Sequence, residues 1–155
     1  RPVQLGRQLG LTDSQQEDLR VAGLLQEVGP RDPRLVRVMG EMPASRDSRL
    51  DSMRTALKLV DEYSHYHEVV STGWPVDETR TSIGVKVLAV ADAYETPQTG
   101  TATRQAFAPW TALQEIERGA GTTFATEVVR ALRKVARVEG VEFDGIEPAR
   151  AIKLA

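Results

Sequence analysis

The stretch TSIGVKVLAVADAYE, residues 81–95, decides how this sequence folds. Large apolar side chains recur in it at helical spacing, at Ile83, Val87, Val90 and Tyr94. A second face of the same helix is nearly apolar too. A helix with this much apolar surface is usually buried on most sides. We therefore expect this segment to be the central helix, with the other helices packed around it.

Helical signals continue on both sides of this segment. Thr12 is a good N-cap, and Gln15 follows three residues later, as in a capping box. The helix that they open should end at Gly29-Pro30. Pro109 suits the first position of another helix. Further helical patterns cover residues 1–10, 49–63, 109–119 and 125–140.

Polar and glycine-rich or proline-rich segments separate these patterns. Residues 65–80 contain a Gly-Trp-Pro turn and are predicted to form a loop, as is PQTGTAT at residues 97–103. Residues 31–48 are irregular in signal. The prediction is an all-α bundle of about five to seven helices, with one domain over residues 1–140 and a tail over residues 141–155.

Composition bounds the function classes. The chain has 155 residues, enough for one domain with its own core. It has no cysteine, which excludes disulfides, thiolate metal sites and a cysteine nucleophile, and fits a reducing, cytoplasmic compartment. The net charge of −2 gives no general attraction to nucleic acid. No apolar run is long enough to span a membrane.

Four phrases, taken in order, resemble the HD-GYP family, a branch of the metal-dependent HD-superfamily phosphohydrolases that hydrolyses cyclic di-GMP. They are LGLTDSQQEDLRVAGLLQEVG, HYHEVVSTGWP, IGVKVLAVADAYE and ALQEIERGAGTTFATEVVRAL. The resemblance covers about residues 5–135 and implies an HD-domain-like helical bundle in a bacterial signalling protein. It also implies that the first turns of the opening helix lie before Arg1, so that the chain is a piece of a longer protein.

The resemblance places this chain's residues at the family's metal-ligand positions. Gln26 and Glu27 stand where the family has its His-Asp pair, and His65 and Asp92 match a histidine and an aspartate. His67 falls on a glutamate position. The family's Gly-Tyr-Pro becomes Gly-Trp-Pro here. Most of the ligands are therefore missing, and these five positions are interpreted as a vestigial site.

A donor count supports the same interpretation without the family. A dinuclear phosphodiesterase centre needs about six protein donors, and this chain has only two histidines. The expectation is no bound metal and no cofactor. The alternative is one iron or manganese ion held by Glu27, Asp92 and a histidine. The simpler reading makes Asp92 a buried carboxylate paired with an arginine or a hydroxyl, and makes Gln26 and Glu27 a polar helix end.

Two further features suggest contacts with other molecules. Gly73, Trp74 and Pro75 are candidate partner-binding residues, because an aromatic side chain on a loop is a good interaction anchor. The alternative is a tryptophan folded back over the core. Arg46, Arg49 and Arg54 belong to an arginine-rich stretch and are possible phosphate-binding residues. The alternative for them is a solvated, ion-paired surface.

The leading hypothesis is a catalytically inactive HD-GYP-like signalling domain. It would act through a protein partner or a homodimer, without binding nucleic acid. One alternative is a divergent metal-dependent cyclic di-GMP phosphodiesterase. Another is a sensor that binds a cyclic dinucleotide without hydrolysing it.

Overall fold

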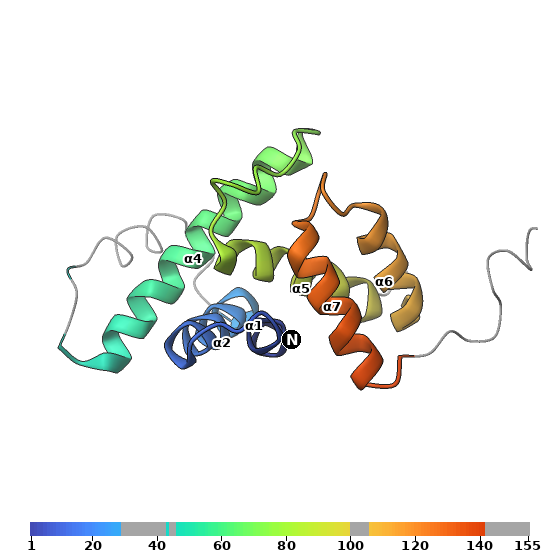
Figure 1. Cartoon of the computed structure of the whole chain (residues 1–155). Coiled ribbons are helices and arrows are strands. Elements are labelled where there is room, and N and C mark those ends of the chain that lie inside the picture. The colour runs from blue at the N-terminus through green and yellow to red at the C-terminus, as the bar shows by residue number, and fades with distance from the viewer. Residues whose placement is uncertain (29–42, 44–45, 100–105, 142–155) are drawn as a thin grey trace, which may run out of the picture.

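The computed structural model describes residues 1–28, 43, 46–99 and 106–141, and within them it has six helices and no strand (Figure 1). The helices are α1 (Pro2–Gln8), α2 (Asp13–Val28), α4 (Ser48–Ser71), α5 (Ile83–Thr99), α6 (Pro109–Arg118) and α7 (Thr126–Val138). This confirms the predicted all-α class and the number of helices. Nearly all of the irregular stretch 31–48, and the tail from residue 142 onward, lie outside the described residues. None of the described helices is long and apolar enough to cross a bilayer.

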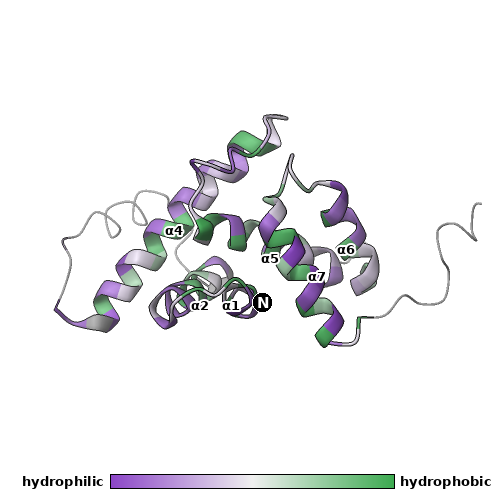
Figure 2. Ribbon diagram, viewed as in Figure 1, coloured by the Kyte–Doolittle hydropathy of each residue, from purple (hydrophilic) through white to green (hydrophobic). Residues whose placement is uncertain are grey.

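Helix α5 is the centre of the bundle, as its sequence predicts. Residues 84–91 and Tyr94 are all buried, and α5 packs against each of the other five described helices. Figure 2 shows mainly hydrophobic residues on the first turns of α5, whereas α4 and α7 alternate between hydrophobic and hydrophilic residues. That alternation is the pattern of helices with one face on a core.

Local sequence signals explain where several helices begin. The backbone N–H of Thr12 donates to Gln15 Oε1 at 3.0 Å, and the N–H of Gln15 donates to Thr12 Oγ1 at 3.2 Å. These two bonds are the predicted capping box. Asp47 caps α4 by accepting the N–H of Arg49 at 2.9 Å. Pro109 occupies the first turn of α6, where its missing N–H costs no helical bond.

Two helices run further than predicted. The loop prediction for residues 65–80 is wrong at its start, because α4 continues to Ser71. Tertiary contacts account for the extra turns, since the Tyr66 hydroxyl donates to the Thr123 carbonyl. Helix α5 likewise continues through Pro97 to Thr99. A proline so near the helix end removes only one helical hydrogen bond.

Candidate functional site

Asp92, on the exposed side of α5, is held by two hydroxyl groups. The Tyr63 hydroxyl on α4 donates to Asp92 Oδ2 at 3.0 Å, and Thr96 Oγ1 donates to Asp92 Oδ1 at 3.2 Å. The ion pairs found among the described residues do not involve Asp92. The prediction that Asp92 pairs with a hydroxyl group is therefore confirmed. The prediction that Asp92 is buried is wrong, because its side chain is solvent-exposed.

Asp92 lies at the edge of a cavity of about 460 Å³ between α4 and α5, which we call the tyrosine pocket. Its main side chains are Tyr63, Tyr66, His67, Asp92, Thr96 and Phe124. The Tyr63 and Tyr66 rings are nearly parallel with centroids 6.3 Å apart, and His67 meets Tyr63 edge-on at 6.1 Å. The pocket therefore combines an aromatic wall with one carboxylate.

Both phenols in the pocket are neutral hydrogen-bond donors. Burial raises the pKa of Tyr63 far above its usual value, and the negative charge of Asp92 raises it further. Burial also raises the pKa of Tyr66 to about 12. Low-dielectric surroundings disfavour a phenolate, so each hydroxyl keeps its proton and its hydrogen bond at neutral pH.

The predicted metal-ligand positions are brought together only in pairs around Asp92 and not at one point. Gln26 shares a second hollow, of about 360 Å³, with Asp92, whereas His67 lines the tyrosine pocket. His65 lines a different groove. His65 and His67 are separated because α4 extends through both of them, and residues two apart on a helix point about 200° away from each other. Glu27 belongs to α2, but its side chain is outside the described part.

The donor set that the structure describes does not fit a metal centre. Nowhere in the described ranges do three side chains of the His, Cys, Asp and Glu types gather as metal ligands would. Two or three such donors per ion are the minimum for a catalytic site of this kind. The described side chains therefore do not fit a catalytic metal, and the expected lack of a cofactor stays a prediction.

The loop after α4 presents a tryptophan to solvent. Trp74 is 70% exposed, so it does not fold back over the core. Gly73 has a φ of +93°, a left-handed conformation that glycine adopts without strain. Just beyond, the N–H of Val76 donates to the Thr122 carbonyl at 2.6 Å. This bond ties the loop to the turn between α6 and α7.

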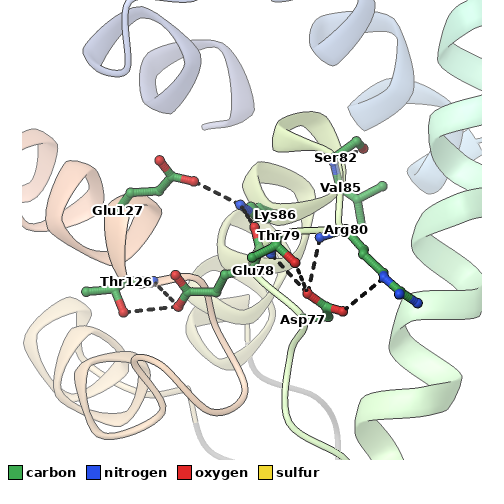
Figure 3. A network of polar contacts seen from close by, with 9 residues as sticks. All are labelled: Asp77, Glu78, Thr79, Arg80, Ser82, Val85, Lys86, Thr126 and Glu127. Atoms are coloured by element: carbon green, nitrogen blue, oxygen red, sulfur yellow. Dashed lines mark hydrogen bonds and ion pairs between the residues drawn. The ribbon is translucent and has the colours of Figure 1, made fainter.

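A polar network braces the same loop against α5 and α7 (Figure 3). Lys86 is only 7% exposed, and its Nζ donates to the Glu78 carbonyl at 2.6 Å. It also pairs with Glu127 Oε1 at 3.0 Å. Glu78 Oε1 in turn accepts the N–H and the hydroxyl of Thr126, both at 3.1 Å. The Glu78 side chain thus accepts hydrogen bonds from the backbone N–H and the hydroxyl at the first turn of α7.

A turn built on Asp77 completes the network. Asp77 Oδ1 accepts the Thr79 hydroxyl at 2.7 Å and the backbone N–H groups of Thr79 and Arg80 at 3.0 and 3.2 Å. These bonds hold the pKa of Asp77 below its usual value, with the Thr79 hydroxyl as the main cause. The sequence analysis did not identify this network. Its one available signal was Lys86, the single cation within an apolar helix.

Two of the three candidate phosphate-binding arginines, Arg49 and Arg54, have acidic surroundings. Arg54 pairs with Asp51 at 3.2 Å. Arg49 lines a hollow together with Glu17, Asp18 and Asp51. Arg46 is exposed in the segment before α4. An anionic ligand in the hollow beside Arg49 would meet several carboxylates, so the geometry favours the ion-paired alternative.

No family model, curated protein or solved structure gives a significant match to this chain. The HD-GYP resemblance therefore stays an expectation from sequence.

The tyrosines predict a pH dependence of stability. Tyr63, Tyr66 and Tyr94 are the only tyrosines in the chain, and burial raises the pKa of each. An unfolded tyrosine titrates near pH 10, so above that pH the unfolded state binds fewer protons than the folded state. Stability should be unaffected by these groups below pH 10 and should fall as the pH rises beyond it.

Phenolate absorbance measures this directly. We expect the folded chain to show less phenolate at pH 10 than the chain in concentrated guanidinium chloride, which should be about half ionised there. A folded sample that titrates with a midpoint near pH 10 would contradict the burial of these hydroxyls.

Proposed function

We propose that this chain is a non-catalytic helical signalling domain that works through protein association, with the Gly73–Pro75 loop as its contact. The observation that carries the proposal is Trp74, 70% exposed on a loop that is bonded to the turn after α6 and to Lys86 of α5. Large aromatic side chains are usually at least partly buried in a free protein. At interfaces, tryptophan is among the residues that contribute most binding free energy.

The bracing supports an interaction role for this tryptophan. The Val76–Thr122 backbone bond and the Lys86 contact with Glu78 fix the loop before any partner arrives. A preorganised loop loses less conformational entropy on binding than a mobile one. The bonds thus hold the backbone of the loop that carries the exposed indole.

A second copy of the chain is the partner that this surface fits. Next to Trp74 lies an open groove of about 360 Å³ whose walls are mostly apolar, with Val69, Val70, Pro75 and Val85 among its lining residues. A tryptophan beside an apolar groove can insert into the groove of a second copy, and the second copy can do the same. This self-complementary arrangement is what a two-fold symmetric dimer requires.

The proposal that the domain is non-catalytic follows from the separation of the candidate ligands. His65 faces the groove beside the loop, whereas Asp92 and His67 face the tyrosine pocket. A two-metal phosphodiesterase mechanism requires the donors to converge on ions about 4 Å apart. The described side chains offer no such convergence.

Sedimentation analysis of the full chain over a range of concentrations tests the association. We expect a reversible dimer, and we expect Trp74→Ala to weaken it by roughly 30-fold or more, the effect of losing an interface hot spot of about 2 kcal/mol. Phe107→Ala is the matched control, because Phe107 is an exposed aromatic away from the loop, and it should leave the dimer unchanged.

Three results would overturn this proposal. The first is a chain that stays monomeric at the highest concentration reached. The second is a dimer that Trp74→Ala and Phe107→Ala weaken equally. The third is turnover of cyclic di-GMP after addition of manganese or iron, which would show that the domain is an enzyme.

A further inference from the structure

We propose that the tyrosine pocket binds a small organic cation, an ammonium or guanidinium group carried on a short apolar or aromatic body. This site lies on the other side of Tyr66 and Val70 from the groove beside Trp74, and those two residues form a wall shared by both. The inference goes beyond the proposed association and does not depend on it.

The size and lining of the pocket are those of a ligand site. Its volume of about 460 Å³ falls within the roughly 300–1,000 Å³ typical of small-molecule sites. Most of the wall is apolar or aromatic, with Val70, Ala89, Pro97 and Phe124 as examples. Two of the polar side chains in the lining, Tyr63 and Thr96, bond to Asp92. Such a wall accepts the apolar body of a ligand, and the carboxylate orients its polar end.

The charge in the pocket selects a cation. Within the part of the chain that the structure describes, Asp92 is the only Asp, Glu, Lys or Arg side chain that lines the pocket, so none of the described lysines or arginines balances it there. Its two hydrogen bonds come from neutral hydroxyls, whereas a carboxylate offers about four acceptor positions. An ammonium or guanidinium donor can occupy the remaining positions. A phosphate or carboxylate ligand would instead be repelled.

The aromatic rings add to the same preference. Tyr63 is fixed through its hydroxyl to Asp92, and Tyr66 is fixed through its hydroxyl to the Thr123 carbonyl. Neutral phenol rings attract a nearby cation through their electron-rich faces. Because both rings are held in place, they lose little freedom when a ligand enters.

The cations on the other side of Asp92 have partners of their own. In the second hollow, Arg20 pairs with Glu17 at 2.6 Å and Arg1 pairs with Glu139 at 2.5 Å. Glu95 in that hollow adds a further carboxylate. The arginines of the second hollow therefore do not neutralise Asp92, and its negative charge acts on a ligand in the tyrosine pocket.

Three probes of one shape and different charge test the proposal on the isotope-labelled full chain by NMR. Benzylamine, protonated at neutral pH, should bind with a dissociation constant in the millimolar range, as fits a ligand of so few atoms. It should shift the backbone amide signals of residues 63–70, 92–97 and 123–124. Benzyl alcohol should bind at least about fivefold more weakly, and benzoate should not bind.

Asp92→Asn is the decisive variant, because asparagine keeps the shape and can still accept the Tyr63 hydroxyl. It should lower the affinity for benzylamine about tenfold. Glu68→Gln is the matched control, since it removes one negative charge from α4 outside the pocket, and it should leave that affinity unchanged.

Several outcomes would overturn the cation site. They are equal binding of benzylamine and benzyl alcohol, unchanged benzylamine affinity in Asp92→Asn, or shifts confined to residues outside the pocket. Tighter binding of manganese than of benzylamine at the same residues would assign the site to a metal instead. Failure of this test leaves the dimer test intact, because sedimentation reports on Trp74 and not on Asp92.

Discussion

Leu88→Ala is expected to lower the free energy of unfolding by about 3–4 kcal/mol. Leu88 is fully buried, at 0% exposure, in the middle of α5. Removing three buried carbons loses their transfer free energy and leaves a cavity, and Leu→Ala changes of this kind cost roughly 2–5 kcal/mol. A value in the middle of that range, and not at its low end, applies because α5 is enclosed by the other described helices, which limits the collapse of the cavity.

Urea unfolding followed by circular dichroism measures this change. The midpoint should fall while the slope stays constant, which would mark a loss of stability without a change in the surface exposed on unfolding. Val138→Ala is the control, because Val138 is 88% exposed at the end of α7. It should change stability by less than about 0.5 kcal/mol. A Leu88→Ala effect below about 1 kcal/mol would mean that α5 is not the centre of the core.

Much of the fold follows from local signals in the sequence. The apolar faces of residues 81–95 predict a central helix, and α5 is buried over residues 84–91. Thr12 and Gln15 predict a capping box, and both of its hydrogen bonds are present. These features depend on residues within one or two helical turns of each other, so periodicity and capping chemistry suffice to predict them.

The end of α4 could not be predicted in this way. The Gly-Trp-Pro sequence marks a turn correctly, but the helix continues until Ser71, just before it. Part of what holds the added turns is the bond from Tyr66 to Thr123, a residue 57 positions away. Tertiary contacts of this kind override local propensity and leave no periodic signal.

In the candidate site too, some residues could be predicted from the sequence and others depend on tertiary contacts. Asp92 and His67 were singled out from sequence, and both line the tyrosine pocket. Their main neighbour, Tyr63, was not singled out, because its pairing with Asp92 joins two helices. The predicted set of vestigial positions was not brought together at one point, since the extended helix turns His65 away from His67. Residue type pointed to Asp92, but only the three-dimensional arrangement identifies its neighbours.

Lys86→Ala is expected to cost about 2–3 kcal/mol and to loosen the Trp74 loop. The substitution removes most of a buried side chain and leaves the Glu78 carbonyl without the donor that now lies 2.6 Å away. A buried acceptor without its partner costs about 1–3 kcal/mol, and the lost side-chain packing adds to this. Lys86→Met keeps most of the apolar stem and should cost less, about 1–2 kcal/mol.

Glu127→Gln separates the ion pair from the carbonyl contact. Glu127 is half-exposed, so its 3.0 Å pair with Lys86 is screened and should contribute less than about 1 kcal/mol. Hydrogen exchange adds a local measurement, because the Val76 amide is bonded to Thr122 within the loop. We expect this amide to exchange faster in Lys86→Ala than in Glu127→Gln.

The comparison of these variants decides what holds the tryptophan in place. If Lys86→Ala and Glu127→Gln destabilise the chain equally and leave the exchange of Val76 unchanged, the loop does not depend on the bond to the Glu78 carbonyl. If Val76 is deprotected only in Lys86→Ala, a buried lysine of the central helix fixes the loop that presents Trp74. Dimer affinity should then fall in Lys86→Ala although Trp74 is intact, because the loop would have to be ordered on binding.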